Sequence, residues 1–230
     1  MRYIVSFSGG KDSTCLLLWA IAKYGRGNIV VVAADTGAEF PETFEYCEYI
    51  ERKLGVKIHW AKSRKWDFYS YCRHRGKFPN MQNRFCTSDL KQVPLAVWVT
   101  ANCNRKEDIL LTGERWEESG KRAGYLPNYY NKKLRINGHR PILALKTREV
   151  FTAIRQAGLH PHPVYQHFTR LGCYCCVFNT IHEWVQLARY YPELFERTAL
   201  LEEEINYTVK QGITLRELVT QRVNQIELAL

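Results

Sequence analysis

A stretch near the start of the chain has the residue types and spacing of a phosphate-binding loop. Residues 8–13 read Ser-Gly-Gly-Lys-Asp-Ser. Adjacent glycines let a backbone approach an anion without Cβ atoms in the way, while a lysine and two serines add hydrogen-bond donors. Asp12 stands out because a carboxylate repels phosphate; it would hold Mg²⁺ or cap a helix through a side-chain oxygen. The competing interpretation is an ordinary glycine turn.

The residues on either side of this stretch favour the phosphate loop over the turn. Residues 2–5 form a short run rich in β-forming types, and residues 14–22 form an apolar run long enough for a buried helix, which Gly25 ends. The loop therefore lies where a strand passes into a helix, whose first turn supplies unpaired N–H groups and a positive dipole end. We assign catalytic roles to Lys11 and Asp12. The predicted anion-binding residues are Ser6, Phe7, Ser8, Gly9, Gly10, Lys11, Asp12 and Ser13.

The Ser-Gly-Gly-Lys-Asp-Ser string resembles the pyrophosphatase loop (PP-loop) of the adenine nucleotide α-hydrolase-like superfamily. Members of that superfamily usually split ATP into AMP and pyrophosphate or bind a sulfonucleotide. The resemblance therefore implies an adenine nucleotide at this loop, with Mg²⁺ accompanying ATP. The stretch does not have the Gly-x-x-x-x-Gly-Lys-Ser/Thr pattern or the three-glycine dinucleotide fingerprint.

A buried strand is predicted at residues 28–34, because this run is apolar almost without interruption. Ligands of parallel sheets gather beyond the carboxyl ends of the strands, so Ala34, Asp35 and Thr36 should face the glycine loop. Their backbone groups could then contact the adenine. The residues that follow, with Pro41 and several acids, also suit the start of a helix, and both interpretations can hold.

Another strand is predicted at residues 108–112, and the loop after it carries two arginines. Gly113 opens this loop, which contains Arg115, Ser119 and Arg122. Two guanidinium groups can clamp a phosphate or sulfate, and Ser119 can donate one more hydrogen bond. Taken alone, the string also suits a solvated charged loop. We assign Arg115 a catalytic role and the other three residues to nucleotide binding.

Four of the eight cysteines could form a metal or redox centre. Cys173 and Cys176 have the Cys-x-x-Cys spacing with which two thiolates bind a zinc ion or an iron–sulfur cluster, or cycle as a dithiol. Cys86, if the fold brings it near, adds a third ligand, and Cys175 is a candidate for the fourth. We predict a [4Fe–4S] cluster or Zn²⁺ here, with a redox or sulfur-carrying dithiol as the alternative.

Composition sets the broad class of protein. The 230 residues are 46% hydrophobic, which suffices for one full core with a smaller appendage. We see no secretory segment and no apolar run near the ~20 residues that a bilayer requires, so we expect a cytoplasmic protein with thiol cysteines and no membrane partner. The net charge of +10 predicts anionic partners, without separating a nucleotide from a nucleic acid.

Residues 62–83 interleave basic and aromatic residues. This pattern suits phosphate contact combined with base stacking, as in proteins that bind single-stranded nucleic acid. A solvated helical face packed by its own aromatic residues explains the pattern equally well.

Alternating strands and helices predict an α/β fold: an open parallel Rossmann-like sheet of about five strands with helices on both faces, plus a small C-terminal helical region. The predicted strands are 2–5, 28–34, 56–60, 108–112 and 140–143. Residues 121–140 show little periodicity and are predicted to be a long, partly mobile loop near the site. We divide the chain into a nucleotide-binding domain, residues 1–165, and a cysteine-containing segment with C-terminal helices, residues 166–230.

Three further strings resemble the phosphoadenosine phosphosulfate (PAPS) reductase branch of the superfamily. They are Arg-x-Cys-Thr-x-x-x-Lys-x-x-Pro-Leu at 84–95, Gly-x-Arg-x-x-Glu-Ser-x-x-Arg at 113–122 and Arg-x-Gly-Cys-x-x-Cys at 170–176. The chain is identified as a member of the PAPS reductase-like family. The resemblance implies that Lys91 and Arg170 also bind the nucleotide. The family usually has proline after the Cys-x-x-Cys, where Val177 stands here.

Two departures from the family pattern bear on the reaction. Sulfonucleotide reductases carry a catalytic cysteine in a Glu-Cys-Gly-x-His-like string near the C-terminus, whereas no cysteine follows Cys176 here. Cluster-bearing reductases use adjacent cysteine pairs, whereas Thr87 follows Cys86. Both departures argue against reduction of a sulfonucleotide to sulfite.

Three functions remain open. The first is an ATP-dependent enzyme that adenylates an acceptor and releases pyrophosphate, with sulfur then delivered from a donor through the cysteine centre to a nucleic acid such as tRNA or DNA. The second is a reductase of adenylyl sulfate (APS) or PAPS. The third is a catalytically silent nucleotide-binding subunit within a larger protein assembly. We favour the first.

Overall fold

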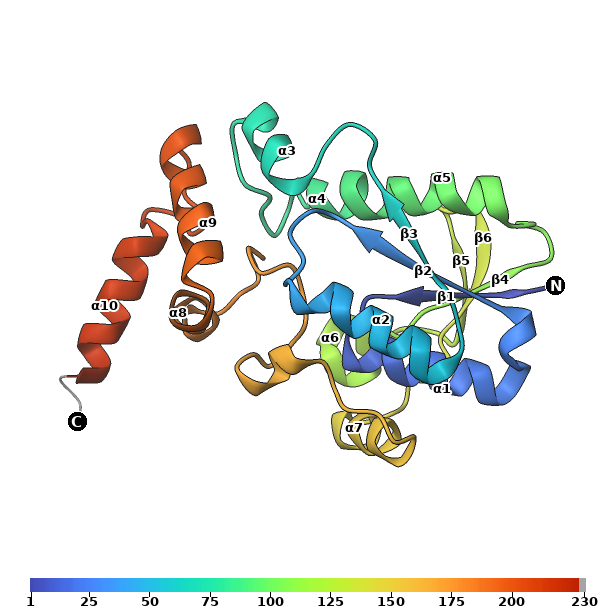
Figure 1. Ribbon diagram of the computed structural model, residues 1–230. Helices are drawn as coiled ribbons and strands as arrows, with labels where there is room; N and C mark the ends of the chain where they lie inside the picture. Colours follow the sequence, from blue (N-terminus) through green and yellow to red (C-terminus); the bar gives the residue numbers. More distant parts are fainter. Residues whose placement is uncertain (228–230) are drawn as a thin grey trace.

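The computed structural model of the chain describes residues 1–227. Its centre is a six-stranded sheet with the strand order β3-β2-β1-β4-β6-β5 (Figure 1). The strands are β1 (Tyr3–Phe7), β2 (Ile29–Asp35), β3 (Ile58–Lys62), β4 (Ile109–Leu111), β5 (Asn128–Asn131) and β6 (Ile136–His139). Neighbours pair in parallel except β5 and β6, which pair antiparallel at one edge. The predicted open α/β sheet is confirmed, with one strand more than expected.

Helices cover both faces of this sheet (Figure 1). The helices α1 (Lys11–Tyr24), α2 (Glu42–Leu54) and α7 (Thr147–Gln156) pack on one face, and α5 (Val93–Asn102) packs on the other. Their apolar stripes bury the sheet on both sides, which explains why β2 is apolar along most of its length. No helix among residues 1–227 combines the length and the apolar character that crossing a bilayer requires.

The order of the strands places a crevice beside β1. The chain passes from β1 to β2 and β3 on one side and then returns to β4 on the other side of β1. Loops that leave β1 and β4 therefore diverge, and in sheets of this kind the ligand lies between them at the carboxyl ends of the strands. The glycine loop follows β1 directly, so the topology puts it at this point.

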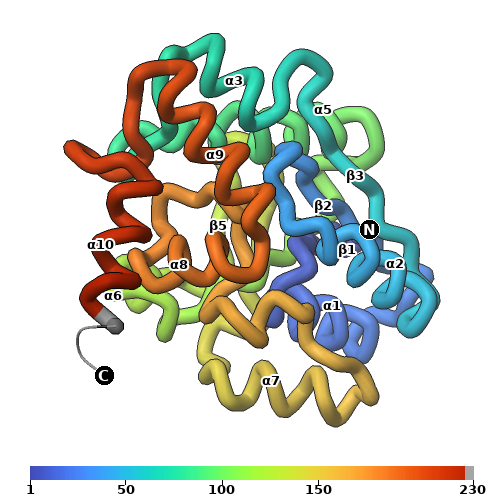
Figure 2. Tube along the Cα trace, turned by 60° about the vertical axis from the view of Figure 1, so that its left-hand side comes forward, coloured from blue at the N-terminus to red at the C-terminus, as the bar shows by residue number. Residues whose placement is uncertain are grey.

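A second, aromatic core joins the C-terminal helices to the middle of the chain. The helices α8 (Ile181–Tyr190), α9 (Pro192–Ile205) and α10 (Leu215–Glu227) lie on the same side as α3 (Phe68–Arg75), which contacts α9 (Figures 1 and 2). Trp184 is fully buried in this core. Glu202, also buried, accepts hydrogen bonds from the N–H groups of Val209 (2.7 Å) and Leu215 (2.8 Å) and so ties α9 to the start of α10. The division of the chain at residue 165 stays a prediction.

Two sequence predictions about residues 121–143 are wrong. The segment 121–140 is not one long loop, because it contains α6 (Gly120–Ala123) and the β5–β6 hairpin. Residues 140–143 are not a strand; the strand beside β4 is β6, and Pro141 begins a turn. Pro141 has no N–H to donate to a sheet, and the apolar residues after it are buried by packing in the turn. The hairpin escaped detection because its strands carry polar residues such as Asn128 and Asn137 on an exposed face.

Candidate nucleotide-binding site

The glycine loop leaves backbone N–H groups without protein acceptors at the start of α1. The loop spans Ser8 to Gly10, and the first helical hydrogen bond runs from Thr14 N–H to the Gly10 carbonyl (2.9 Å). Within the part of the chain that the structure describes, the N–H groups of Gly10, Asp12 and Ser13 donate to no protein atom. Gly9 has φ +73°, a conformation that favours glycine. Free N–H groups at a helix start are the donors that bind phosphate.

The two serines of the loop hold its shape. Ser13 donates through its hydroxyl to the Gly10 carbonyl (3.0 Å), and its Oγ accepts the Ser8 N–H (3.2 Å). The Ser8 hydroxyl lies 3.2 Å from the same Oγ. Ser13 is buried, whereas Ser8 is exposed, so Ser13 braces the loop and Ser8 faces outward.

Asp12 is held between two cations. Its Oδ2 accepts a hydrogen bond from Lys11 Nζ (3.0 Å), and its Oδ1 accepts one from Arg115 Nε (2.6 Å). Each carboxylate oxygen can still accept a further contact, so Asp12 fits the role of a magnesium ligand. The hydrogen bond to Arg115 joins the first turn of α1 to the segment that follows β4. These two segments lie at the same edge of the sheet because β1 and β4 are parallel neighbours.

Arg115 has a different position from the one the sequence suggested. Its side chain is 2% exposed, and it also donates to Glu117 (2.8 Å), the Leu145 carbonyl (3.0 Å) and Thr147 (3.1 Å). These contacts commit most of the guanidinium donors to the protein itself. Arg115 therefore orients Asp12 in this structure, and its direct contact with a phosphate stays a prediction.

In the segment that follows β4, Gly113 lies close to the glycine loop, whereas Ser119 and Arg122 have their contacts at α6. Gly113 lies against the start of α1, since a Cβ on it would stand 3.2 Å from the Asp12 carbonyl oxygen. Ser119 caps the exposed helix α6 by accepting the Arg122 N–H (3.3 Å), and Arg122 pairs with Glu118. Both side chains have local partners, so their role in nucleotide binding also stays a prediction.

The carboxyl end of β2 connects the loop region to the cysteines. Thr36 is 1% exposed and donates through its hydroxyl to Glu39 (2.6 Å), while its Oγ1 lies 3.6 Å from Cys173 Sγ. Asp35 instead accepts the Gly37 N–H (2.8 Å) and pairs with Lys62 (2.8 Å). Nothing here shows how an adenine lies, so the contacts of residues 34–36 with a base stay predictions.

Tyr165 completes the loop from far along the sequence. Its hydroxyl accepts the Lys11 N–H (2.9 Å), and it also lies 3.4 Å from where a Gly10 Cβ would be. Leu171 packs beside both glycines of the loop. Sequence reasoning missed Tyr165, because a contact over this separation in the sequence has no local pattern.

His162 lies behind the loop and was also missed. Its ring carbon Cδ2 stands 3.7 Å from the position of a Gly9 Cβ, and the side chain is 1% exposed. Its Nδ1 accepts the Val164 N–H (3.1 Å), so Nε2 carries the ring proton and has no partner among the described residues. Burial lowers the pKa of His162 to about 4, which keeps the ring neutral at physiological pH.

Three of the four predicted metal ligands gather around Lys91. Burial raises the pKa of the Cys86 and Cys173 thiols, and for Cys173 the neighbouring Lys91 ammonium opposes this shift. The Lys91 pKa is raised in turn, chiefly by Cys173, with smaller effects of Glu39, Cys176 and Cys86. Within residues 1–227, no three His, Cys, Asp or Glu side chains are arranged to hold a metal ion. The metal site therefore stays a prediction.

The adjacent cysteines Cys175 and Cys176 differ in their surroundings. Cys176 Sγ accepts a hydrogen bond from Arg170 Nη2 (3.2 Å), which places a guanidinium beside this sulfur. Cys175 is fully buried in the aromatic core, and burial raises its pKa well above the usual value for a thiol. Its role as a fourth ligand stays a prediction. Arg170 lies at the cysteines here, and its contact with a nucleotide stays a prediction.

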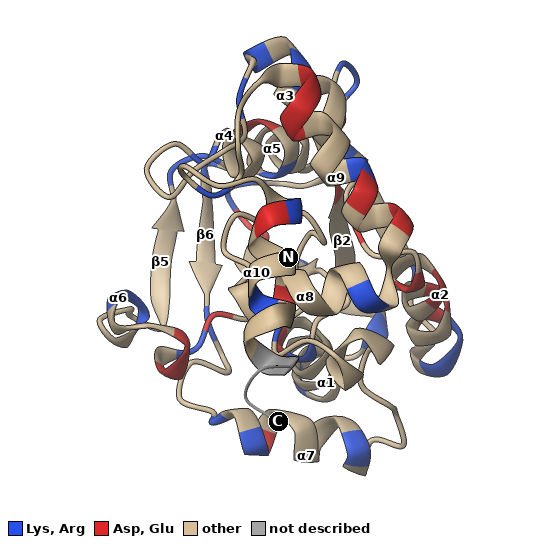
Figure 3. Cartoon of the chain, turned by 90° about the vertical axis from the view of Figure 1, so that its left-hand side faces the viewer, with Lys and Arg blue, Asp and Glu red and all other residues tan. Residues whose placement is uncertain are grey.

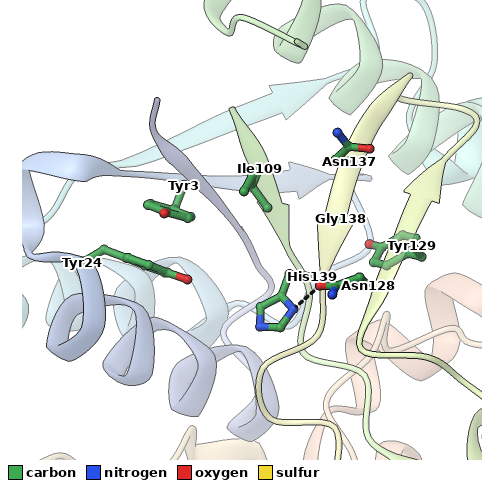
Figure 4. A pocket seen from close by; sticks show the side chains of 8 residues that line it. All are labelled: Tyr3, Tyr24, Ile109, Asn128, Tyr129, Asn137, Gly138 and His139. Carbon is green, nitrogen blue, oxygen red and sulfur yellow. Dashed lines mark hydrogen bonds between the residues drawn. The ribbon is translucent and has the colours of Figure 1, made fainter. Parts of the chain in front are cut away.

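The structure also has a pocket away from this site, with a volume of about 560 Å³. It opens over β4, β6 and β5 beside Tyr24 of α1, and His139 Nδ1 hydrogen-bonds Asn128 Oδ1 (2.7 Å) in its wall (Figure 4). None of the predicted nucleotide-binding residues lines it. The candidate site is therefore the anion-binding loop at the carboxyl edge of the sheet.

The fold and the loop together define the class of protein. An open parallel sheet with a Ser-Gly-Gly-Lys-Asp-Ser loop after its first strand is a nucleotide-binding fold of the PP-loop adenine nucleotide α-hydrolase-like type. Residues 2–178 match the family model described as the phosphoadenosine phosphosulfate reductase domain. The chain belongs to this family.

Similar proteins come from a phage and from an archaeon. An uncharacterized 37.8 kDa protein of Escherichia phage 186 is 29% identical over 91% of this chain and 77% of its own length. Two uncharacterized proteins of Methanocaldococcus jannaschii are 32% and 27% identical over 84% of this chain. The matches cover 40% and 45% of those archaeal proteins, so this chain spans less than half of their length.

Solved structures support the fold. A PAPS reductase from Candida auris, in a phosphate complex, has a TM-score of 0.57 at 13% identity, covering 76% of this chain and 83% of that chain. An FMN adenylyltransferase from Candida glabrata, in complex with FMN and an ATP analogue, has a TM-score of 0.55 at 14% identity, covering 75% and 55% of the two chains. At these identities the likeness concerns the fold alone.

Proposed function

We propose that the chain binds ATP at residues 8–13 and transfers the adenylyl group to an acceptor, releasing pyrophosphate. The observation that carries this proposal is the set of free N–H groups on Gly10, Asp12 and Ser13 beside Lys11. They form an anion site that reads phosphate through the backbone, without requiring a particular side chain. The FMN adenylyltransferase of Candida glabrata, which shares the fold, was solved both with ATP and with FAD and inorganic pyrophosphate.

The reaction needs little covalent chemistry from the protein. An acceptor oxygen attacks the α-phosphorus, the bond from that phosphorus to the bridging oxygen breaks, and pyrophosphate leaves with both electrons of that bond. Lys11 and the free N–H groups would stabilise the charge that develops on the leaving group. Asp12 would hold Mg²⁺, which supplies further neutralisation of charge. Arg115 keeps Asp12 in place through its 2.6 Å hydrogen bond.

The acceptor in this proposal is a nucleic acid such as tRNA or DNA, and the cysteines take part in a later transfer of sulfur from a donor. The net charge of +10 supports an anionic acceptor. The Cys176 thiol beside Arg170 supports a nucleophilic sulfur. No step of the proposal passes through a metal or an iron–sulfur cluster.

The second candidate is a sulfonucleotide reductase, and the thiols around Lys91 favour it. The same anion site would hold the sulfate or phosphate of APS or PAPS, and one of the thiols would attack sulfur. This candidate predicts sulfite from a sulfonucleotide and a requirement for an external dithiol such as thioredoxin. A catalytically silent subunit, the third candidate, predicts nucleotide binding with no product and stable protein partners.

Product analysis separates these candidates. Protein purified without oxygen is incubated with Mg²⁺ and ATP, with and without tRNA or DNA, and in parallel with APS and PAPS. We expect pyrophosphate and an adenylated nucleic acid from ATP only when the nucleic acid is present, and no sulfite. Lys11→Ala should abolish the product, whereas Lys57→Ala, at an exposed lysine just before β3, should not. Sulfite without pyrophosphate would refute the proposal and establish the reductase.

The predicted metal centre has its own measurement. An absorption spectrum near 400 nm, with iron, zinc and sulfide assays on the anaerobic protein, reports a cluster or zinc directly. A metal-free protein that still releases pyrophosphate from ATP would remove the metal from this site while leaving adenylyl transfer intact.

A further inference from the structure

The positive charge of the chain is concentrated in two segments. Residues 61–92 contain eight Lys or Arg and two Asp, and residues 121–140 contain six Lys or Arg and no acid. The summed net charge of these two segments exceeds the +10 of the whole chain, so the remaining residues carry a small net negative charge. Such an asymmetry indicates an anionic partner at one place rather than a generally basic surface.

The fold brings the two segments together. Arg75 of α3 and Lys133 of the β5–β6 hairpin both lower the pKa of Asp89, so both cations lie near this carboxylate. Asp89 is itself engaged by hydrogen bonds from Tyr71 (2.5 Å) and Ser88 (2.5 Å). Lys and Arg gather beside α4 (Phe85–Thr87) and the end of the hairpin (Figure 3). The exposed cations of this basic face are Arg75, Arg84, Lys132, Lys133 and Arg135.

The aromatic residues of the first segment contribute packing rather than surface. Phe68, Tyr69, Tyr71 and Phe78 are buried in the aromatic core. The basic side chains between them are largely exposed. This arrangement fits a solvated face built on an aromatic core. Arg73 pairs with Glu204 (2.7 Å), so it does not belong to the charges offered to a partner.

The Phe178 ring lies next to both Arg84 of the basic face and Arg170 beside the cysteines. The Arg84 guanidinium lies 5.6 Å and the Arg170 guanidinium 5.9 Å from the centre of the Phe178 ring. Arg170 also contacts Cys176 Sγ. A chain of phosphates bound on the basic face would therefore lead to Arg84 and then to the thiol at Cys176.

We propose that the basic face binds the backbone of a single-stranded nucleic acid, with a base stacked at Phe178. This inference rests on the proposed function and specifies its acceptor. The exposed cations contact phosphates, and the half-buried Phe178 ring between two arginines offers a surface on which an unpaired base can stack. A duplex keeps its bases inside and could use the charges but not the ring. The geometry thus favours a single strand or an open loop.

Binding of a labelled oligonucleotide by the full-length chain tests this inference. We expect fluorescence anisotropy to show binding of a single-stranded DNA or RNA oligonucleotide, with log Kd rising linearly with log salt. The triple variant Lys132→Glu, Lys133→Glu, Arg135→Glu should raise Kd about tenfold or more and reduce the salt slope by about 0.7 for each phosphate that the protein no longer neutralises. Phe178→Ala should raise Kd about fivefold or more while leaving the salt slope unchanged.

A matched triple variant provides the control. It reverses three exposed charges on α1 and α2, outside both basic segments: Lys23→Glu, Arg52→Glu and Lys53→Glu. Its effect on Kd should be less than half that of the triple variant at residues 132, 133 and 135. Equal effects of the two triple variants would overturn the basic face. Equal or tighter binding of a duplex of the same sequence would overturn the single-stranded partner.

Calorimetry of ATP binding on the same samples distinguishes this inference from the proposed function. We expect all these variants to bind ATP as the unmodified chain does, which also shows that they are folded. ATP binding without any oligonucleotide binding overturns the nucleic-acid face alone. If the unmodified chain does not bind ATP, the proposed function is overturned.

Discussion

The phosphate loop and the cysteine site lie near each other but are built in different ways. The loop belongs to a continuous strand–loop–helix unit, and its backbone N–H groups are the donors proposed to bind an anion. The cysteine site takes Thr36, Cys86, Lys91 and Cys173 from separate parts of the chain and depends on the aromatic core to hold them together. The first is therefore a property of local sequence, and the second is a property of long-range packing. Substitutions should affect the two regions in different ways.

The largest effect is expected at Arg115, the residue that ties the loop to the rest of the sheet. Arg115→Met should lower the free energy of unfolding by about 2 kcal/mol or more, because the largely buried Asp12 loses its 2.6 Å hydrogen bond and the Leu145 carbonyl loses its donor. Urea unfolding measures this loss. Arg115→Lys keeps the charge but not the fork of donors, so it should recover only part of the stability. If the free energy of unfolding of Arg115→Met equals that of the unmodified protein, the Arg115–Asp12 hydrogen bond does not stabilise the loop.

The stability contributed by His162 behind the loop should depend on pH. Burial lowers its pKa from 6.5 to about 4, so the unfolded chain binds a proton that the folded chain excludes. Stability should therefore be complete above pH 6.5 and fall as the pH is lowered towards 4, by a total on the order of 3 kcal/mol.

His162→Asn removes the titrating group while its Oδ1 can still accept the Val164 N–H, so this slope should disappear. Denaturant unfolding measured from pH 4 to 7 checks this expectation. The exposed His182→Asn is the control and should keep the slope of the unmodified protein. A slope that persists in His162→Asn would assign the pH dependence to another group.

Gly9→Ala should affect stability and nucleotide binding together. Gly9 has φ +73°, and a Cβ there would contact Leu171 at 3.5 Å, so we expect a loss of about 1–2 kcal/mol and weaker ATP binding. Gly25→Ala is a matched control, because Gly25 has φ +75° with open space around it. It should lose similar stability and bind ATP normally. If both variants bind ATP equally well, the close packing of the loop is not needed for binding.

The smallest effect is expected in the reactivity of the thiols. Alkylation with iodoacetamide at pH 8, followed by peptide mass spectrometry, should label Cys176 before the buried Cys175 and Cys47. Arg170→Met should slow labelling of Cys176 about threefold or more and leave Cys103, on the far side of the sheet, unchanged. Equal labelling of Cys175 and Cys176 would show that the aromatic core does not separate the two thiols.

The same contrast explains how much of the molecule could be predicted from the sequence. The strand, the loop and the helix that follows it all leave local patterns, and the structure confirms them at residues 3–24. The partners that fix the loop, Arg115 and Tyr165, leave no such pattern, because their hydrogen bonds span 103 and 154 positions. A sequence can show that an arginine is available, but packing decides whether its donors face a ligand or the protein.

The cysteine site shows the same limit. The Cys-x-x-Cys spacing predicts that two thiols lie close together, and the Lys91 string marks a lysine, but neither pattern shows that this lysine lies among the thiols. Cys175 could not be separated from its neighbours by spacing, because only the aromatic core determines which way it points. The β5–β6 hairpin was missed for a related reason. β6 pairs with β4 and β5 pairs only with β6, and both strands carry polar residues instead of the apolar run of a central strand.

The hydrogen bond between Lys11 and Tyr165 also has a consequence for synthesis of the chain. The ribosome makes Lys11 154 positions before its partner Tyr165. β1, β2 and β3 can pair while the second half is still being made, whereas the phosphate loop gains its cover only when residue 165 emerges. A nascent chain that stops before this point should contain part of the sheet with an uncovered anion site. We therefore expect the loop to be completed after β1, β2 and β3 have paired.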